Sequence, residues 1–305
     1  MRLPIFKALV GVLLLASTAC EPLSEQDGGY GNPERTPLWV ALDEARLDGP
    51  GRHHVEYLDL AKLRILKEKH PGRFSRLAEI GVGEALRRSD DTGIPLKTAS
   101  SAALFGRPPA QAGLLRGRFD VDGIALSLNR LGYTRNQQVW QRAEQDGLSV
   151  VEPGEDLVTY AGSLQTHEQV RPPSKVPRLS GSTPHRAVSW CLGWPLAAVL
   201  TEPGSPGEAD LIGAAANAVE AEFADGADFT EALCYHTTGD PEALAERLRT
   251  ALREGASART GKPWRDLLPG AEVEVGQDAT VRLSFPQTGD VGVLVEALSR
   301  NDVPL

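Results

Sequence analysis

The sequence predicts an α+β fold of two halves, each a mostly antiparallel sheet with helices packed on one face. Short apolar segments separated by turn residues such as Gly, Pro and Asp recur along the chain, as is typical of antiparallel strands. Segments with apolar residues at helical spacing lie between groups of strands instead of alternating with single strands, which argues against a doubly wound parallel sheet. At 305 residues the chain is long enough to bury a substantial core.

The chain divides into four segments by composition. Residues 21–37 are rich in Gly and Pro and nearly devoid of aliphatic side chains, so they cannot bury enough surface to become ordered. Residues 163–182 are polar, contain three prolines, and carry the boundary between the two halves. The resulting segments are a signal peptide (1–19), a flexible tether (20–52), an N-terminal α+β half (53–170) and a C-terminal α+β half (171–305).

In the N-terminal half, aspartates mark the starts of two helices. Asp59 is expected to cap a helix with its leucines on one side, and Asp120 to cap a second amphipathic helix that Gly132 ends. The remaining expected elements are a helix over 74–88, a strand over 112–120 and three short strands over 139–142, 148–151 and 157–160.

In the C-terminal half, a helix capped by Thr183 is expected to end at Gly193, and Asp240 opens the most strongly patterned helix of the chain. Residues 211–223 fit either a helix or a strand, because alanine favours a helix while Gly213 favours a strand. The remaining expected elements are strands over 197–201 and 230–236, a hairpin over 273–275 and 281–285, and a last helix over 291–298.

Cys20 follows a short cationic stretch, an apolar run over 8–16 and the small residues 17–19. This order is that of a secretory signal, and a cysteine at the first mature position resembles the signal of bacterial lipoproteins. Lipoprotein signals usually carry an aliphatic residue three positions before the cysteine, and here that position holds Ser17. Cleavage after Ala19 without lipidation is therefore the alternative. We expect a diacylglyceryl group on Cys20 to hold an exported protein at the outer face of the cell membrane, because the apolar run is too short to span a bilayer.

The charge of the chain argues against nucleic-acid binding. Removal of residues 1–19 takes away Arg2 and Lys7 and leaves 286 residues with a formal charge of −11, which repels nucleic acid. Two cysteines remain after lipidation, Cys191 and Cys234, and in an oxidising compartment such a pair usually forms a disulfide. A redox-active or metal-binding pair is the alternative, but no Cys-x-x-Cys spacing supports it.

Several packing and turn motifs cover most of the mature chain: Gly113-Leu-Leu-Arg-Gly-Arg-Phe-Asp120, Leu128 through Leu131-Gly132-Tyr133, Asp156-Leu-Val-Thr-Tyr-Ala-Gly162, the stretch from Cys191-Leu-Gly193 through Cys234, Gly261-Lys-Pro-Trp264, and Arg300-Asn-Asp302. On these motifs the chain resembles an uncharacterised family of secreted lipoproteins from high-GC Gram-positive bacteria. The resemblance implies export and an α+β fold. It brings no activity, cofactor or catalytic residues.

The sequence contains no recognised catalytic or metal-binding motif. Gly-x-Ser-x-Gly is absent, and Ser182, three residues before His185, fits a loop that leads into a helix cap. His53 and His54 are adjacent, so they should point in different directions and be solvated at a domain edge, with a surface copper or zinc site as the alternative. Asp120 is explained as a helix cap rather than a catalytic carboxylate. We therefore expect no cofactor and no bound metal.

Trp194 is the best candidate for a ligand or partner surface, because it follows a helix end in an exposed loop; core packing is the alternative. The leading hypothesis is a non-catalytic binding or accessory protein of the cell envelope, with an envelope protein or a small ligand as its partner. The rival is an envelope hydrolase whose catalytic residues come together from distant positions. A deep pocket lined by convergent polar groups would favour the rival.

Overall fold

The computed structural model describes residues 36–78, 82, 94–143, 148–170, 175–203, 209–218 and 229–305. The strands in these ranges are β1 (His54–Asp59), β2 (Ala99–Phe105), β3 (Ala112–Gly117), β4 (Thr134–Asn136), β5 (Val139–Gln141), β6 (Val150–Glu152), β7 (Leu157–Ala161), β8 (Ala197–Thr201), β9 (Leu211–Ala218), β10 (Phe229–His236), β11 (Glu272–Val275) and β12 (Thr280–Gln287). The α-helices are α1 (Pro37–Leu42), α2 (Leu60–Lys69), α4 (Val121–Arg130), α5 (Leu164–His167), α6 (Thr183–Leu192), α7 (Pro241–Glu254), α8 (Trp264–Leu267) and α9 (Val293–Ser299).

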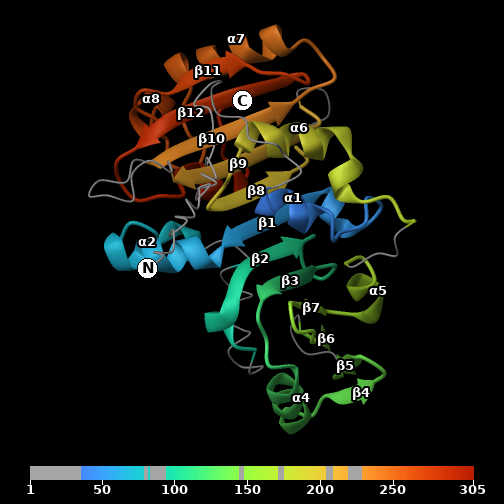
Figure 1. Ribbon diagram of the computed structural model, residues 1–305. Coiled ribbons are helices and arrows are strands. Elements are labelled where there is room, and N and C mark those ends of the chain that lie inside the picture. Colours follow the sequence, from blue (N-terminus) through green and yellow to red (C-terminus); the bar gives the residue numbers. More distant parts are fainter. Residues whose placement is uncertain are drawn as a thin grey trace, which may run out of the picture.

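All of these strands pair antiparallel in one sheet, in the order β11-β12-β10-β9-β8-β1-β2-β3-β7-β6-β5-β4 (Figure 1). The predicted α+β class with antiparallel strands is confirmed. The separate sheet expected for each half is not, because β1 pairs with β2 on one side and with β8 on the other. The N- and C-terminal parts of the chain therefore meet along the β1–β8 pair.

The strand order is equivalent on the two sides of this pair. Outward from β1 it runs β1-β2-β3-β7-β6, and outward from β8 it runs β8-β9-β10-β12-β11. On each side a helix follows the third strand, α4 after β3 and α7 after β10, before the chain returns to the sheet. The two sides thus share a topology that the sequence, which has no clear repeat, does not reveal.

Helices cover both faces of the sheet, whereas the sequence predicts them on one face of each half. Leu200 and Ala198 of β8 face a core cluster that includes α1 and α6, which Figure 1 shows on the same side. Val199 and Ala197 face the other cluster, which includes α2, α4, α7 and α9. The reason is that every residue of β8 is buried, so its two faces are both apolar and both need cover.

The predicted caps form as expected on three helices. The carboxylates of Asp59, Asp120 and Asp240 accept from the backbone N–H groups of Lys62, Gly123 and Glu242, which satisfies one orphan donor at each helix start. The helix predicted from Thr183 is α6, and its N-cap is Ser182. Residues 211–218 form strand β9, while 219–223 lie outside the described residues.

Two predictions change. The flexible tether predicted over 20–52 is wrong for 36–52, because α1 begins there, capped by the Thr36 hydroxyl, and buries Leu38, Ala41 and Leu42 in the core. Residues 20–35, with Cys20, lie outside the described residues. The helix predicted over 74–88 begins instead with a short 3₁₀ turn at Arg76–Ala78, and Val82 is helical. Residues 79–81 and 83–88 lie outside the described residues.

Cys191 of α6 and Cys234 of β10 form the predicted disulfide, with their Cα atoms 6.0 Å apart. The bond ties α6 to the centre of the C-terminal strands. No helix in the described ranges is both long enough and apolar enough to cross a membrane.

Candidate functional site

A cleft of about 800 Å³ opens at one end of the central strands. Its walls come from separate segments, among them the turn that ends at Arg52, the start of α6, the residue after β8, the start of β9 and the end of β10. Strand pairing brings these segments together, since His54 lies opposite Thr201 and Leu211 lies opposite His236. The cleft therefore sits beside the β1–β8 pair that joins the two parts of the chain.

His185 is the most deeply buried titratable group of the cleft. Its side chain lies in the first turn of α6 and is only 3 % exposed. Burial lowers its pKa to about 4, against the opposing attraction of the Glu202 carboxylate, so the ring is neutral at neutral pH. Its Nδ1 is 3.0 Å from the Ser182 hydroxyl, and a hydrogen bond between the ring and the backbone of Arg52 opposes the fall of its pKa.

Charged groups surround this neutral ring. Glu202, just after β8, accepts from Arg52 Nε at 3.3 Å and contacts His53 Nδ1 at 2.5 Å. On another wall the Asp210 carboxylate lies 3.2 Å from His236 Nδ1. Glu202 lies about 150 residues after Arg52 in the sequence, and Asp210 lies 26 residues before His236. Because the partners are this far apart, no local motif predicts the pairs.

His54 faces the opposite side of the sheet from the cleft and is buried. Its Nε2 is 2.9 Å from Glu56 Oε1, and the second Glu56 oxygen accepts from the backbone N–H of Val82. His53, in contrast, has a side chain that is 65 % exposed. The predicted divergence of the two histidines is correct, but solvation holds for His53 only, because the carboxylate two residues along the strand pairs with His54 inside the protein.

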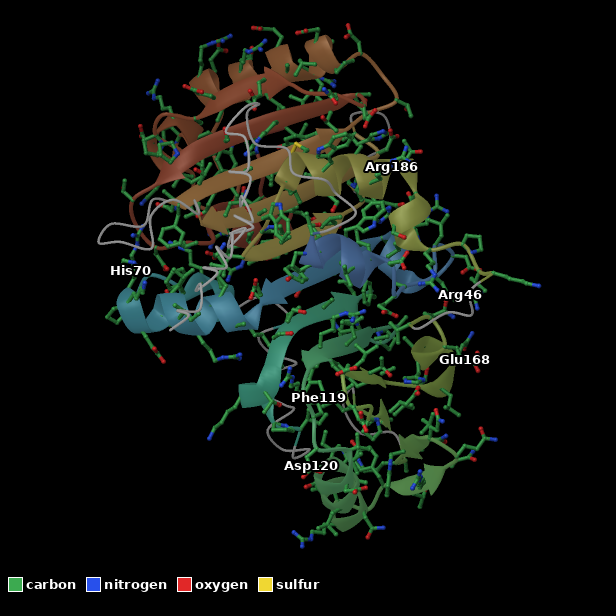
Figure 2. All side chains as sticks on the ribbon, in the orientation of Figure 1. Arg46, His70, Phe119, Asp120, Glu168 and Arg186 are labelled. Carbon is green, nitrogen blue, oxygen red and sulfur yellow. A yellow bond between two sulfur atoms is a disulfide. The ribbon has the colours of Figure 1, made fainter. Side chains whose placement is uncertain are left out.

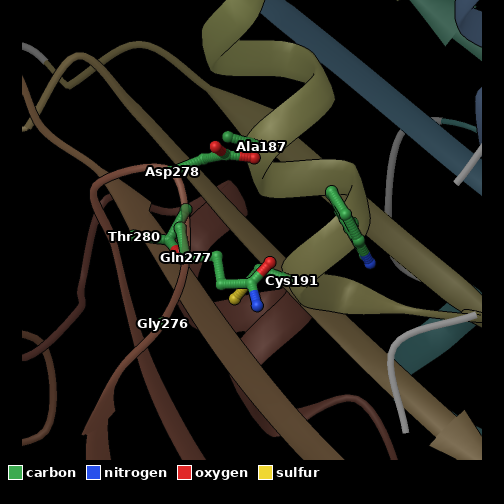
Figure 3. Close-up of a pocket in the computed structure, with 7 residues that line it drawn as sticks. Ala187, Cys191, Gly276, Gln277, Asp278 and Thr280 are labelled. Atoms are coloured by element: carbon green, nitrogen blue, oxygen red, sulfur yellow. The ribbon is translucent and has the colours of Figure 1, made fainter.

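The described residues contain no group of three or more His, Cys, Asp or Glu side chains arranged to hold a metal ion. A small space next to the disulfide, between α6 and the β11–β12 turn, measures only about 20 Å³ (Figure 3). Ala187 and Cys191 line one side of it, and Gln277 and Asp278 line the other. That volume holds about one water molecule, so it is not a ligand site.

A larger hollow of about 1020 Å³ lies in the N-terminal part, around Phe119 and Asp120. Figure 2 shows these two residues in the lower part of the molecule, far from Arg186 of α6 near the first cleft. Its polar lining is mainly carboxylates at exposed turns, and Asp120 is already engaged as the cap of α4. Among the described residues that line this hollow, no buried side-chain atom lacks a hydrogen-bond partner.

The Ser182–His185 pair places a hydroxyl beside an imidazole, the first requirement of a serine nucleophile. Two features oppose catalysis. A base works best with a pKa near the working pH, and that of His185 is about 4. Among the described residues no carboxylate forms a hydrogen bond with the ring, as the third member of a catalytic triad does.

The other predicted site residues lie apart from the cleft. Trp194 is 45 % exposed, as expected, but follows the end of α6 opposite to the end that lines the cleft. Cys191 and Cys234 support the cleft indirectly, because their disulfide fixes α6 over β10. Arg52, Glu202, Asp210 and His236 could not be predicted from the sequence as members of this cleft. The spacing His54-x-Glu56 indicates only the buried pair on the opposite face of the sheet, since residues two apart on a strand share a face.

No family model and no curated protein matches this chain. Among solved structures, crystal forms I, III and IV of TP0453 are similar to it at 11 %, 13 % and 9 % identity, with TM-scores of 0.45, 0.41 and 0.42. These alignments cover 88 %, 87 % and 86 % of this chain and 98 % of each TP0453 chain. Similarity at this level supports no inference about function.

Proposed function

We propose that this protein is a non-catalytic binding protein of the cell envelope, held at the outer face of the membrane by a diacylglyceryl group on Cys20. The signal-like N-terminus and the resemblance to secreted lipoproteins of high-GC Gram-positive bacteria support export. A small ligand binds in the cleft at His185, and Trp194 offers a separate exposed surface for a partner protein.

One observation carries the binding role: a cleft of about 800 Å³ brings Arg52, His185 and Glu202 together from separate segments of the chain. The cleft is of the size that usually holds small ligands. Convergent polar groups also agree with the rival hydrolase, but the low pKa of His185 favours binding over base catalysis.

A thermal-shift screen of small polar molecules against the purified protein in detergent tests this role. Hits should raise the melting temperature of the wild type, since a ligand that binds only the folded state stabilises it. They should lose their effect in Thr238→Trp, which fills the cleft from an exposed wall position. Leu126→Trp, at an exposed site on α4, is the matched control and should respond like the wild type.

Two results would count against the proposal. A screen without any hit that depends on Thr238 would remove the cleft as a binding site. Turnover of an ester or amide substrate that is lost in Ser182→Ala, with covalent labelling of Ser182 by a serine-directed phosphonate, would instead establish the hydrolase.

A further inference from the structure

We propose that the exposed side of α2 binds the anionic surface of the membrane and so orients the protein there. The proposal rests on the membrane location proposed for this protein, but on neither the acyl chain nor the ligand cleft. It follows from the placement of lysines along the chain, from an exposed apolar side chain beside them, and from the reach of the N-terminal segment.

Helix α2 is a basic segment of an acidic protein. Its 10 residues include three lysines and Arg64 but only one carboxylate, that of Glu68, so its formal charge is +3. The mature chain as a whole carries −11. The three leucines of the helix are buried, while Arg64, Lys67 and Lys69 are exposed. Figure 1 shows α2 at the left margin of the molecule, where this charge faces outward.

The turn Leu96–Thr98 extends the basic surface. Arg64 donates at 2.8 Å to the carbonyl of Ala99, directly after this turn, and so holds the turn beside the helix. Lys97, in the middle of the turn, is exposed. Lys67 lies three residues after Arg64, on the same side of the helix. Lys67, Arg64 and Lys97 therefore form a row of cations, which we call the basic α2 surface.

The type of cation favours a membrane over a protein partner. Arginine outnumbers lysine 25 to 7 in the chain, yet four of the six lysines after the signal segment lie in α2 or in the turn next to it. Protein–protein interfaces are enriched in arginine and depleted in lysine. Lysine places a compact charge on a flexible stem, which suits mobile lipid phosphates. The concentration of lysine therefore indicates lipid headgroups.

Ile65 adds an apolar contact beside the cations. Its side chain is 51 % exposed, although it belongs to a helix whose leucines pack into the core. At a membrane surface an apolar side chain can enter the headgroup region while neighbouring lysines extend to the phosphates. Ile65 and the basic α2 surface therefore offer the two kinds of contact that an anionic bilayer accepts.

The N-terminal segment is long enough to let this surface touch the bilayer. Cys20 and Thr36, where α1 is capped, are 16 positions apart, and an extended chain of that length spans at most about 55 Å. Helix α1 packs against β1, and α2 follows directly on this strand of about 20 Å. Salt screens charges that are more than about 8 Å apart, so distant carboxylates of the chain oppose the contact little.

Co-sedimentation of the mature chain carrying Cys20→Ser with lipid vesicles tests the proposal without the acyl anchor. The protein should bind vesicles made of equal amounts of phosphatidylglycerol and phosphatidylcholine, should not bind vesicles of phosphatidylcholine alone, and should dissociate as salt is added. Lys67→Gln and Lys97→Gln should each weaken binding about fivefold, because each removes one cation from an anionic surface. Ile65→Ser should weaken it severalfold through the lost apolar contact.

Two exposed positions away from α2 provide matched controls. Lys262→Gln removes a lysine just before α8, and Leu126→Ser removes an apolar side chain from α4. Both variants should bind the vesicles like the parent protein. A melting temperature for each variant identifies any loss of binding that comes from unfolding.

Equal binding to the two kinds of vesicle, or binding to neither, would overturn the proposal. Binding to phosphatidylglycerol that Lys67→Gln and Lys97→Gln leave unchanged would overturn it too. A photo-crosslinker in place of Ile65 that labels an acidic protein instead of lipid in cell membranes would assign the surface to a protein partner. Ligand binding and the acyl anchor are measured by thermal shift and by detergent partitioning, so each can stand if the vesicle experiment fails.

Discussion

His185 should make the stability of this protein decrease as the pH is lowered. Burial of the ring lowers its pKa from 6.5 in the unfolded chain to about 4 in the folded one. As the pH falls, the unfolded chain therefore binds a proton before the folded protein does, and the free energy of unfolding decreases. The contribution of the neutral ring is fully present above about pH 6.5 and is lost progressively toward pH 4.

The expected magnitude follows from these two pKa values. Between about pH 7 and pH 5 this single group should remove about 2 kcal/mol of unfolding free energy, and about 3 kcal/mol once the ring is protonated in both states. His185→Gln retains a polar side chain that can contact Ser182 but cannot take up a proton. Urea unfolding of both proteins at several pH values measures the effect as the difference between their stability curves.

Carboxylates titrate equally in the two proteins, so they cancel in this difference. Leu126→Gln is the matched control, because this exposed position of α4 holds no titratable group and the variant should keep the pH dependence of the wild type. If His185→Gln loses as much stability as the wild type between pH 7 and pH 5, the ring is not a buried neutral group. His185 would then no longer be too weak a base for catalysis.

Four other predictions concern the fold and the anchor. Replacing Cys191 and Cys234 by Ala should lower the unfolding free energy by about 4 kcal/mol, given their sequence separation of 43, and urea unfolding that matches the oxidised wild type would contradict this. Ala279→Gly should stabilise the protein by roughly 0.5–1 kcal/mol in the same assay, because Ala279 has a φ of 55°; a loss of stability would show that the methyl group packs usefully. Asp120→Ala should cost about 1 kcal/mol through loss of the α4 cap and leave ligand binding intact, as titration would show. Cys20→Ser should move the protein out of the detergent phase in a partitioning experiment, and unchanged partitioning would rule out the acyl anchor.

The helices could be predicted where their signals are local. An aspartate followed by leucines at helical spacing is sufficient to place α2, and Asp240 followed by Pro241 is sufficient to place α7. Strand β2 is different, because its Ala- and Ser-rich residues 99–103 have little intrinsic preference for a strand. It becomes a strand because β1 and β3 pair with it from both sides.

Glu231 shows that the charge of a side chain does not by itself predict whether the side chain is exposed. It lies in β10 among apolar neighbours and is completely buried. Its carboxylate accepts from the backbone N–H groups of Gly292, Val293 and Leu294 at the start of α9, and from the Gln287 amide. The partners that make its burial tolerable lie about 60 residues away, so no window around Glu231 contains the information.

The cleft is a consequence of how the two parts of the chain are joined. Pairing of His54 with Thr201 brings the residues before β1 next to those after β8, and this places Arg52 beside Glu202. The disulfide holds α6 over β10, so the first turn of the helix projects over the same end of the sheet. The pairing of β1 with β8 brings these residues, which belong to different parts of the chain, to a single cleft. A substitution that weakens the pairing of β1 with β8 should therefore impair ligand binding before it unfolds the strands on either side, because residues from both sides line the cleft.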